Sequence, residues 1–405
     1  MQVSVMRKLF LRTVFIAGLT AFCLVRSAAA SILIDFGDPN TTHLLGQFSA
    51  LERGAGDEPV RVLQLGDSHT GGDYFTQALR EHLQQRFGDA GIGWLTPGYV
   101  KNQRSAQVMM RMSGQWKTRV SHGEPDNFPL GGVVNQAAPG ASMEIVPKLP
   151  LNGLLRVSIW SRRPANSSVG GWKLTFPDGE VRDLPAPYGG DWQVSYVIGN
   201  GAALNSLFLR ASGNPPELGG IAVDTISPGV TVDALGIVGA TQKVITQWQP
   251  DAMKEQLGWR QPDLLILSYG TNEAFDTRFD TEAYRAELHK TIRQLRAAAP
   301  HAVILMVGAP NAGKRNGYGE RMGCKYDLPN ALRNVQTIQR QVAEEERLMY
   351  WDWAAAMGGV CAMQQFTETN PPLARPDLIH FTEEGYARSG TSLFNALMDF
   401  YKKSM

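Results

Sequence analysis

Two polar blocks near opposite ends of this sequence carry the residue types of a nucleophilic catalyst. Ser68 follows the apolar run 60–65 in the block Gly66-Asp67-Ser68, and Asp377-Leu378-Ile379-His380 lies far downstream. A serine hydroxyl is a weak nucleophile, so it needs a neutral imidazole to accept its proton and a carboxylate to orient that imidazole. We therefore predict Ser68 as nucleophile, His380 as base and Asp377 as the orienting carboxylate. Taken singly, the alternatives are a helix N-cap for Ser68 and surface polarity for Asp377 and His380.

A third polar block, Gly270-Thr271-Asn272-Glu273, directly follows another apolar run, 263–268. Attack on an ester carbonyl creates an oxyanion, which must be held by hydrogen-bond donors fixed beside the nucleophile. The side-chain amide of Asn272 and the backbone N–H of Ser68 are predicted to be two of these donors. For Asn272 alone, an ordinary turn residue is the alternative. His69 adjoins the nucleophile and is not expected to act as its base.

The elements that must position these blocks form an alternation of strands and helices at both ends of the chain. Short continuous apolar runs read as strands buried on both faces, at 60–65, 263–268, 302–307 and 348–353. Helical spacing of apolar residues covers 73–86, 281–298, 328–347 and 382–402, the last with Thr382 as its N-cap. Such an alternation predicts an α/β fold with a parallel sheet that helices cover on both faces. Each polar block would then lie at the carboxyl edge of the sheet, where α/β proteins place their sites.

The middle of the chain follows a different pattern. Short β-rich runs separated by turn residues occur at 154–161, 171–176, 191–198 and 205–211, without helices between them. This spacing is typical of an antiparallel β-sandwich. We expect a first part of the α/β domain at 31–115, an inserted β-sandwich at 116–229 and a second part of the α/β domain at 230–405.

Several aromatic residues of this middle region have two possible roles. They could stack on sugar rings at the surface, or they could fill the interior of the sandwich. The residues concerned are Trp160, Trp172, Trp192, Tyr188 and Tyr196.

The first 30 residues are predicted to be a secretory signal that is not part of the fold. Arg7, Lys8 and Arg12 form a basic start, an apolar stretch covers 13–25, and small residues for cleavage stand at 28–30. The apolar stretch is short for a transmembrane helix. We therefore expect an exported protein, in the periplasm or at the cell surface, with no membrane span after cleavage.

The net charge and the cysteine content of the chain indicate which ligands and cross-links to expect. Removing 1–30 takes away four of the 39 basic residues and none of the 38 acidic ones, which leaves a formal charge of −3. Nucleic-acid binding, which needs a basic surface, is not expected. Cys324 and Cys361 remain, and they are candidates for one disulfide in an oxidising compartment, the alternative being two unpaired thiols. We expect no metal and no cofactor, because no ligand cluster of zinc-site spacing is present.

The three polar blocks, in this order, resemble the SGNH (GDSL-like) hydrolase superfamily. Its pattern is Gly-Asp-Ser, a glycine donor, Gly-x-Asn and Asp-x-x-His, and the resemblance covers roughly 60–110 and 230–400. It implies a three-layer α/β core and a further oxyanion donor, the N–H of Gly239, with Gly236 as the alternative. Glu273 stands where many members carry Asp, which is expected to preserve a structural carboxylate.

Within the superfamily, the layout looks most like the bacterial peptidoglycan O-acetylesterases, which are exported and carry a carbohydrate-binding-like β-domain between the serine and glycine blocks. The resemblance implies a serine esterase that removes acetyl groups from cell-wall sugars. An O-acetyltransferase, or an esterase for another acetylated polysaccharide, would use the same triad. A non-catalytic cell-wall binding protein is the alternative from another class. The substrate-binding residues and the oligomeric state cannot be read from the sequence.

Overall fold

A six-stranded, mostly parallel sheet forms the centre of the α/β part of the chain. The computed structural model describes residues 32–123, 126–151, 153–163, 170–185, 190–201, 206–214, 216–315 and 321–405. The strand order is β1-β17-β16-β15-β2-β14, and only β1 runs antiparallel to its neighbour. Their bounds are β1 Leu33–Asp35, β2 Val60–Gly66, β14 Val230–Gly236, β15 Leu264–Ser268, β16 Val303–Val307 and β17 Met349–Trp351. The predicted runs 60–65 and 263–268 are thus adjacent strands of one sheet.

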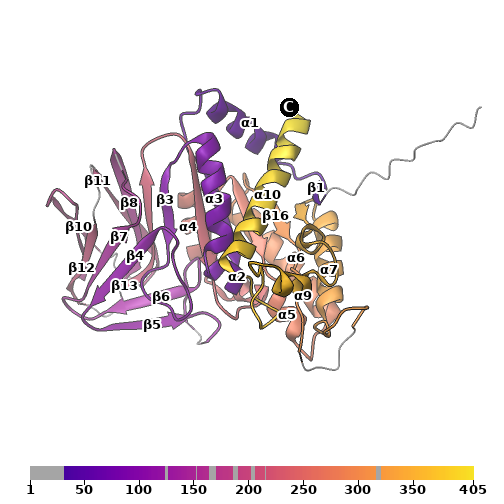
Figure 1. Ribbon diagram of the computed structural model, residues 1–405. Helices are drawn as coiled ribbons and strands as arrows, with labels where there is room; N and C mark the ends of the chain where they lie inside the picture. The colour runs from indigo at the N-terminus through magenta and orange to yellow at the C-terminus, as the bar shows by residue number, and fades with distance from the viewer. Residues whose placement is uncertain are drawn as a thin grey trace, which may run out of the picture. The chain divides into compact units, whose positions relative to one another are not determined.

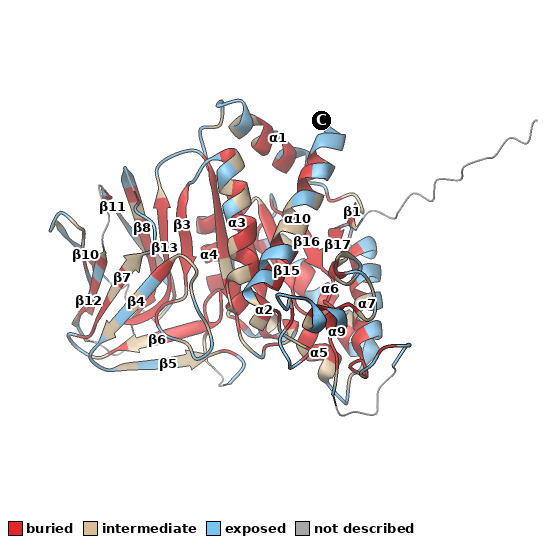
Figure 2. Cartoon of the chain, in the orientation of Figure 1, coloured by how far each residue is buried: buried red, intermediate tan, exposed pale blue. Residues whose placement is uncertain are grey.

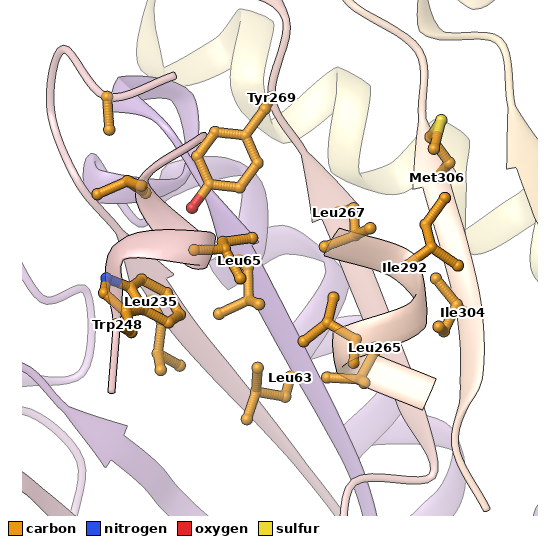
Figure 3. Close-up of a cluster of buried hydrophobic side chains, with 14 of the residues drawn as sticks. Leu63, Leu65, Leu235, Trp248, Leu265, Leu267, Tyr269, Ile292, Ile304 and Met306 are labelled. Atoms are coloured by element: carbon orange, nitrogen blue, oxygen red, sulfur yellow. The ribbon is translucent and has the colours of Figure 1, made fainter. Parts of the chain in front are cut away.

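Both faces of this sheet are buried. Successive side chains of each strand point to opposite faces, and the side chains on each face pack into an apolar cluster. On β2, Leu63 and Leu65 belong to one apolar cluster and Val62 to another. Figure 3 shows the first cluster, in which Leu63, Leu65 and Leu267 pack with Trp248. Continuous apolar runs, and not alternating ones, are therefore what this sheet requires.

Helices cover the sheet on both faces. One face packs against η1 (Gln242–Gln247), α4 (Pro250–Arg260), α6 (Thr281–Ala298) and α7 (Leu332–Glu345). The other packs against α1 (Thr41–Glu52), α3 (Tyr74–Phe87) and α10 (Glu383–Ser404), of which α3 and α10 lie side by side (Figure 1). Short helices follow strands or fill loops: α2 (Ser68–Gly71), α5 (Thr271–Phe275), α8 (Trp353–Met357) and α9 (Ala362–Glu368). The predicted three-layer α/β arrangement is confirmed.

The strands that lie between Gly91 and Thr225 form two antiparallel sheets that pack on each other. One has the order β10-β9-β12-β7-β4 and the other β11-β8-β13-β6-β5, and β3 pairs with β13. The bounds are β3 Gly91–Leu95, β4 Val108–Ser113, β5 Trp116–Val120, β6 Val133–Ala137, β7 Ser142–Pro147, β8 Leu154–Arg162, β9 Gly170–Thr175, β10 Val181–Pro185, β11 Gln193–Asn200, β12 Leu207–Gly213 and β13 Glu217–Thr225. Figure 2 colours β13 as buried along its length, whereas β4 and β5 show exposed residues. The predicted sandwich is therefore present. Its first two strands, β3 and β4, precede residue 116, the expected start of the insert. The division of the chain into domains at 31–115, 116–229 and 230–405 stays a prediction.

The aromatic residues of the sandwich have mostly structural positions. Trp172 is buried between its two sheets, and Trp160 and Trp192 are buried where one sheet packs against the α/β part. Tyr196, in contrast, is 50% exposed. Tyr188 lies outside the described residues, as does the predicted signal at 1–30.

Local features of the prediction agree with the structure in detail. Helix α6 has the predicted bounds, and the Thr382 side chain caps α10 by accepting from the N–H of Gly385 at 3.2 Å. Cys324 and Cys361 form the disulfide, with their Cα atoms 5.4 Å apart. Within the described ranges, no helix combines the length and the apolar character needed to cross a bilayer.

Candidate active site

The structure brings Ser68, His380 and Asp377 into one hydrogen-bonded relay. The Ser68 Oγ lies 3.0 Å from Nε2 of His380, and Nδ1 of the same ring lies 2.8 Å from Oδ2 of Asp377. Ser68 begins α2 directly after β2, whereas the other two residues lie in the loop before α10. The packing of α10 against α3 brings these distant segments together.

The loop that carries Asp377 and His380 is shaped by the carboxylate itself. Oδ1 of Asp377 accepts the backbone N–H groups of Ile379 and His380, each at 2.9 Å. Leu378 adopts a left-handed conformation at φ +62°, which turns the chain back so that Oδ2 reaches the imidazole. Burial raises the pKa of Asp377, but the hydrogen bonds from the ring and from these N–H groups outweigh it and hold the pKa well below its usual range. Asp377 is thus ionised at any working pH, and it fixes the His380 tautomer with the proton on Nδ1.

The turn between β2 and α2 leaves no room for a side chain at Gly66. A Cβ there would lie 2.0 Å from Oγ1 of Thr70 and 2.7 Å from the Ser268 carbonyl oxygen. The Thr70 hydroxyl accepts from Nε2 of Gln64 at 2.9 Å, and Gln64 Oε1 accepts from Thr76 at 3.1 Å. Gln64 therefore ties the strand to α2 and α3 below the nucleophile. Sequence reasoning missed this role, although a lone amide inside an apolar strand was a visible signal.

The two residues next to Ser68, Asp67 and His69, are polar and buried, and they stabilise the turn between β2 and α2. Oδ1 of Asp67 accepts the N–H of His69 at 2.9 Å, and burial raises the pKa of Asp67 to about 6. The His69 ring meets the Tyr386 hydroxyl through Nδ1 at 2.9 Å, and burial lowers the pKa of His69 to about 3. His69 therefore stays neutral, and it packs behind His380 with ring centroids 5.6 Å apart. Its position does not allow it to replace His380 as the partner of Ser68.

The remaining predicted donors follow the two strands that flank β2. Asn272 lies in α5 after β15, and its Nδ2 donates to the Ala240 carbonyl at 2.8 Å. A side-chain amide has two hydrogens, so one is left for another acceptor. Gly239 is exposed in the turn after β14 at φ +80°, and its N–H has no hydrogen-bond partner among the described residues. Gly236, in contrast, is buried, and a Cβ there would lie 2.1 Å from the backbone nitrogen of Gly71.

Glu273 holds the segment that follows Gly239 in place. Its Oε1 accepts the N–H of Gln242 at 2.7 Å, so Asn272 and Glu273 together hold the segment 240–242 that follows Gly239. The other oxygen, Oε2, has no hydrogen-bond partner in the described part of the chain. Burial raises the pKa of Glu273 to about 7; the Gln242 N–H opposes this and the Asp67 charge adds to it. The predicted structural carboxylate thus lies beneath the candidate oxyanion site.

Replacing Glu273 by Gln should change how stability depends on pH. Between pH 4.5 and 7 the folded protein keeps the Glu273 proton and the unfolded chain releases it, so the free energy of unfolding falls as pH rises. A shift of this size corresponds to about 3 kcal/mol across the window. Glu273→Gln keeps an acceptor for Gln242 and removes this loss, so it should match the wild type at pH 5 and exceed it at pH 8.

Urea unfolding of both proteins at the two pH values measures this effect. Glu344→Gln, at an exposed position of α7, is the matched control and should follow the wild type at both. Parallel pH curves for Glu273→Gln and the wild type would show that Glu273 is already ionised at pH 5.

Known protein families and solved structures are similar to this chain. A model of the GDSL-like lipase/acylhydrolase family matches residues 211–388, and a model of the peptidoglycan O-acetylesterase N-terminal region matches residues 90–201. A solved peptidoglycan O-acetylesterase structure is 34% identical over 92% of this chain and 99% of its own, with a TM-score of 0.80. A lipase/acylhydrolase from Enterococcus faecalis is 17% identical over 42% of this chain and 76% of its own. Its TM-score is 0.29, which is too low to support a conclusion about this chain. No curated protein sequence matches significantly. Ser68 lies outside both matched ranges, so its place in the site comes from the geometry.

Proposed function

Because this chain belongs to the GDSL-like peptidoglycan O-acetylesterases, we propose that it removes O-acetyl groups from cell-wall peptidoglycan through a serine acyl-enzyme. The observation that carries the proposal is the Ser68–His380–Asp377 relay in a chain of this family. The enzyme is a carboxylic ester hydrolase, and the roles of the individual residues are part of the proposal.

The first half of the reaction transfers the acetyl group to the enzyme. Ser68 Oγ attacks the acetyl carbonyl carbon while its proton passes to Nε2 of His380, whose lone pair faces the hydroxyl because Nδ1–H donates to Asp377. The tetrahedral intermediate collapses as His380 donates that proton to the sugar oxygen and the bond between this oxygen and the acetyl carbon breaks. The sugar leaves as an alcohol, and the acetyl group remains as an ester on Ser68.

The second half uses the same groups with water as the nucleophile. His380 accepts a proton from water as the water attacks the acetyl-Ser68 carbonyl, and then gives that proton to Ser68 Oγ as the ester bond breaks. Acetic acid is released and ionises. Asp377 remains ionised throughout and stabilises the charged imidazole in both halves.

The oxyanion of each tetrahedral intermediate would be held by donors from three adjacent strands. These are the N–H of Ser68 after β2, the N–H of Gly239 after β14 and the free amide hydrogen of Asn272 after β15. Gly239 is exposed and its N–H has no partner among the described residues, whereas Gly236 packs against α2; this favours Gly239 as the donor. Donors fixed before the reaction stabilise charge without reorganising, which is why such sites accelerate acyl transfer.

Replacing Asn272 by Ala should slow turnover about 10²- to 10³-fold, the range found for removing one oxyanion donor. The variant loses both the donor and the bond to the Ala240 carbonyl. Steady-state hydrolysis of nitrophenyl acetate measures the effect, which should appear mainly in kcat. Asn330→Ala, at an exposed position, is the control. A fall in kcat of less than threefold for Asn272→Ala would remove Asn272 from the oxyanion site.

The substrate is tested by comparing acetylated polymers. Purified protein incubated with O-acetylated peptidoglycan should release acetate faster than from acetylated xylan, and nitrophenyl esters should be cleaved more slowly as the acyl chain lengthens. Ser68→Ala protein gives the background rate. Equal release from xylan, or a preference for long acyl chains, would contradict the peptidoglycan proposal and leave the esterase in place.

Adding a sugar acceptor to the same incubation separates hydrolysis from transfer. A hydrolase yields free acetate whether or not the acceptor is present. An acetylated acceptor with little free acetate would identify a transferase instead.

We also propose that the chain is exported and acts in the periplasm or at the cell surface. The basic start and apolar stretch of 1–30 support this, together with the cell-wall association of the family. The mass of the protein recovered outside the cytoplasm should correspond to a chain that has lost these residues; an intact N-terminus would contradict the proposal.

A further inference from the structure

A large cavity lies at the opposite edge of the parallel sheet from the candidate active site. Its volume is about 980 Å³, and it is lined by residues that precede or begin three strands, including Arg61 on β2, Asp263 before β15 and Ala302 before β16. The sandwich contributes Arg156 of β8, and α4 contributes Trp259. A cavity of this size is in the range that holds small-molecule ligands.

Arg61 is a buried cation whose side chain has no direct partner in the described part of the chain. Its residue exposure is 8%, yet its guanidinium makes no hydrogen bond or ion pair with any residue that the structure describes. The nearby carboxylate of Asp263 is already used, because its oxygens accept the backbone N–H of Arg61 at 2.8 Å and Nε2 of Gln47 at 3.2 Å. A buried charge without a partner is costly, so its donors call for an acceptor inside the cavity.

Arg156 adds a second cation whose donors are also largely unused. Its closest carboxylate contact, to Asp224, is 3.9 Å long, and its Nε is buried without a hydrogen-bond partner in the described ranges. Asp224 is instead paired with Arg260 at 2.6 Å. Burial, together with the positive charges of Arg260 and Arg156, lowers the pKa of Arg61. An anion between Arg61 and Arg156 would relieve this repulsion.

Trp259 lines the same cavity as the two arginines, and Tyr196 packs against Trp259. Trp259 lines the cavity and is half-buried, and its ring centroid lies 5.1 Å from that of Tyr196 on β11. Tyr196 is 50% exposed, in contrast to Trp160, Trp172 and Trp192. The two ring planes are inclined at 38° to each other, and a pair of partly exposed aromatic rings near a cation suits a ligand that has an apolar ring face and one acidic group.

We propose that this cavity is a non-catalytic binding site for a carboxylate-bearing saccharide. The guanidinium groups of Arg61 and Arg156 would hold the carboxylate, for which a planar fork of N–H donors is suited, and Trp259 with Tyr196 would pack against the sugar ring. Asp263 and Glu58 line the same cavity, and their charge favours a singly charged carboxylate over a phosphate. The site is separate from Ser68 and does not depend on the esterase activity.

Calorimetric titration of Ser68→Ala protein with three disaccharides tests the proposal. N-acetylglucosaminyl-N-acetylmuramic acid and digalacturonate carry carboxylates, and N,N′-diacetylchitobiose is the neutral control. At least one acidic disaccharide should bind tenfold or more tightly than chitobiose, and the tighter of the two identifies a wall fragment or a uronate as the source. Equal binding of chitobiose, or binding of sodium acetate as tight as that of the acidic disaccharides, would overturn the proposal.

Variants locate the binding to this cavity. Arg61→Met in the Ser68→Ala background should abolish the preference for the acidic disaccharide, and Trp259→Ala should weaken its binding tenfold or more. Removing an unpaired buried charge should not destabilise the fold; Arg61→Met with Ser68 intact should hydrolyse nitrophenyl acetate normally. Arg156→Met, at a partly exposed position, provides a second test of the cation, and Arg111→Met on β4 is the matched control. Unchanged preference in both Arg61→Met and Arg156→Met would overturn the assignment.

Discussion

Ser68→Ala protein should lose ester hydrolysis by about 10⁶-fold, down to the rate that binding and the oxyanion donors alone supply. The variant keeps the backbone N–H and the turn, because Gly66, Gln64 and Thr70 position this segment without the hydroxyl. Only the nucleophile and its hydrogen bond to Nε2 of His380 are removed. Its thermal midpoint should therefore stay within a few degrees of the wild type.

Two measurements check this prediction independently. Nitrophenyl acetate hydrolysis gives the loss of rate, and a serine-reactive fluorophosphonate should label the wild type at one site and Ser68→Ala at none. Ser404→Ala, at the exposed end of α10, should behave as the wild type in both. Turnover by Ser68→Ala within tenfold of the wild type would remove Ser68 as nucleophile, and labelling of the variant would place the reactive serine elsewhere.

His380→Ala should cost nearly as much as Ser68→Ala, because without the imidazole the Ser68 proton has no acceptor. A second imidazole nearby, His69, is held neutral behind His380 and faces Tyr386. It therefore cannot take over the proton transfer. The rate should fall by about 10⁵- to 10⁶-fold, and fluorophosphonate labelling should slow in parallel.

Asp377→Asn should cost less than His380→Ala, about 10⁴-fold. An Asn oxygen can still accept the N–H groups of Ile379 and His380 that shape the loop. Its amide would face Nδ1, however, and favour the tautomer whose proton sits on Nε2, which cannot accept from Ser68. The ordering of the three variants is the test: a loss for Asp377→Asn equal to that for His380→Ala would show that tautomer control decides the whole rate.

The α/β part of the fold could be predicted because its signals are local. A strand covered on both faces must be mostly apolar, and 60–65 and 263–268 satisfy this although they include the polar residues Arg61, Gln64, Asp263 and Ser268. Helix α6 has its periodicity within its own length and Asp280 as its N-cap, so the sequence defines its bounds. The polar blocks follow such strands directly, which places Ser68 and Asn272 at one edge of the sheet before any coordinates are known.

Other elements could not be predicted because their partners decide them. Strand β14 includes the buried polar residues Thr231 and Asp233, whose side chains accept hydrogen bonds from Arg260 of α4, and Asp233 also accepts the backbone N–H of Trp94. Trp160 and Ile159 alternate on β8, but both faces of that strand are covered by different apolar clusters, so period-two spacing does not say which aromatic residue meets water. The strand order of the sandwich likewise depends on long-range pairing.

The sequence by itself identified the candidate groups: a serine, an imidazole, a carboxylate and an amide, each next to a predictable strand or helix. Only the tertiary structure decided the distances that make them a relay, since Ser68 and His380 meet through the packing of α10 against α3. It also decided that Glu273 holds the turn after Gly239 and that the Arg61 guanidinium lines a cavity with no hydrogen-bond partner among the described residues. The physical reason is that residue type and spacing fix what a side chain can do and on which face it lies, whereas its partners are fixed by how distant segments pack.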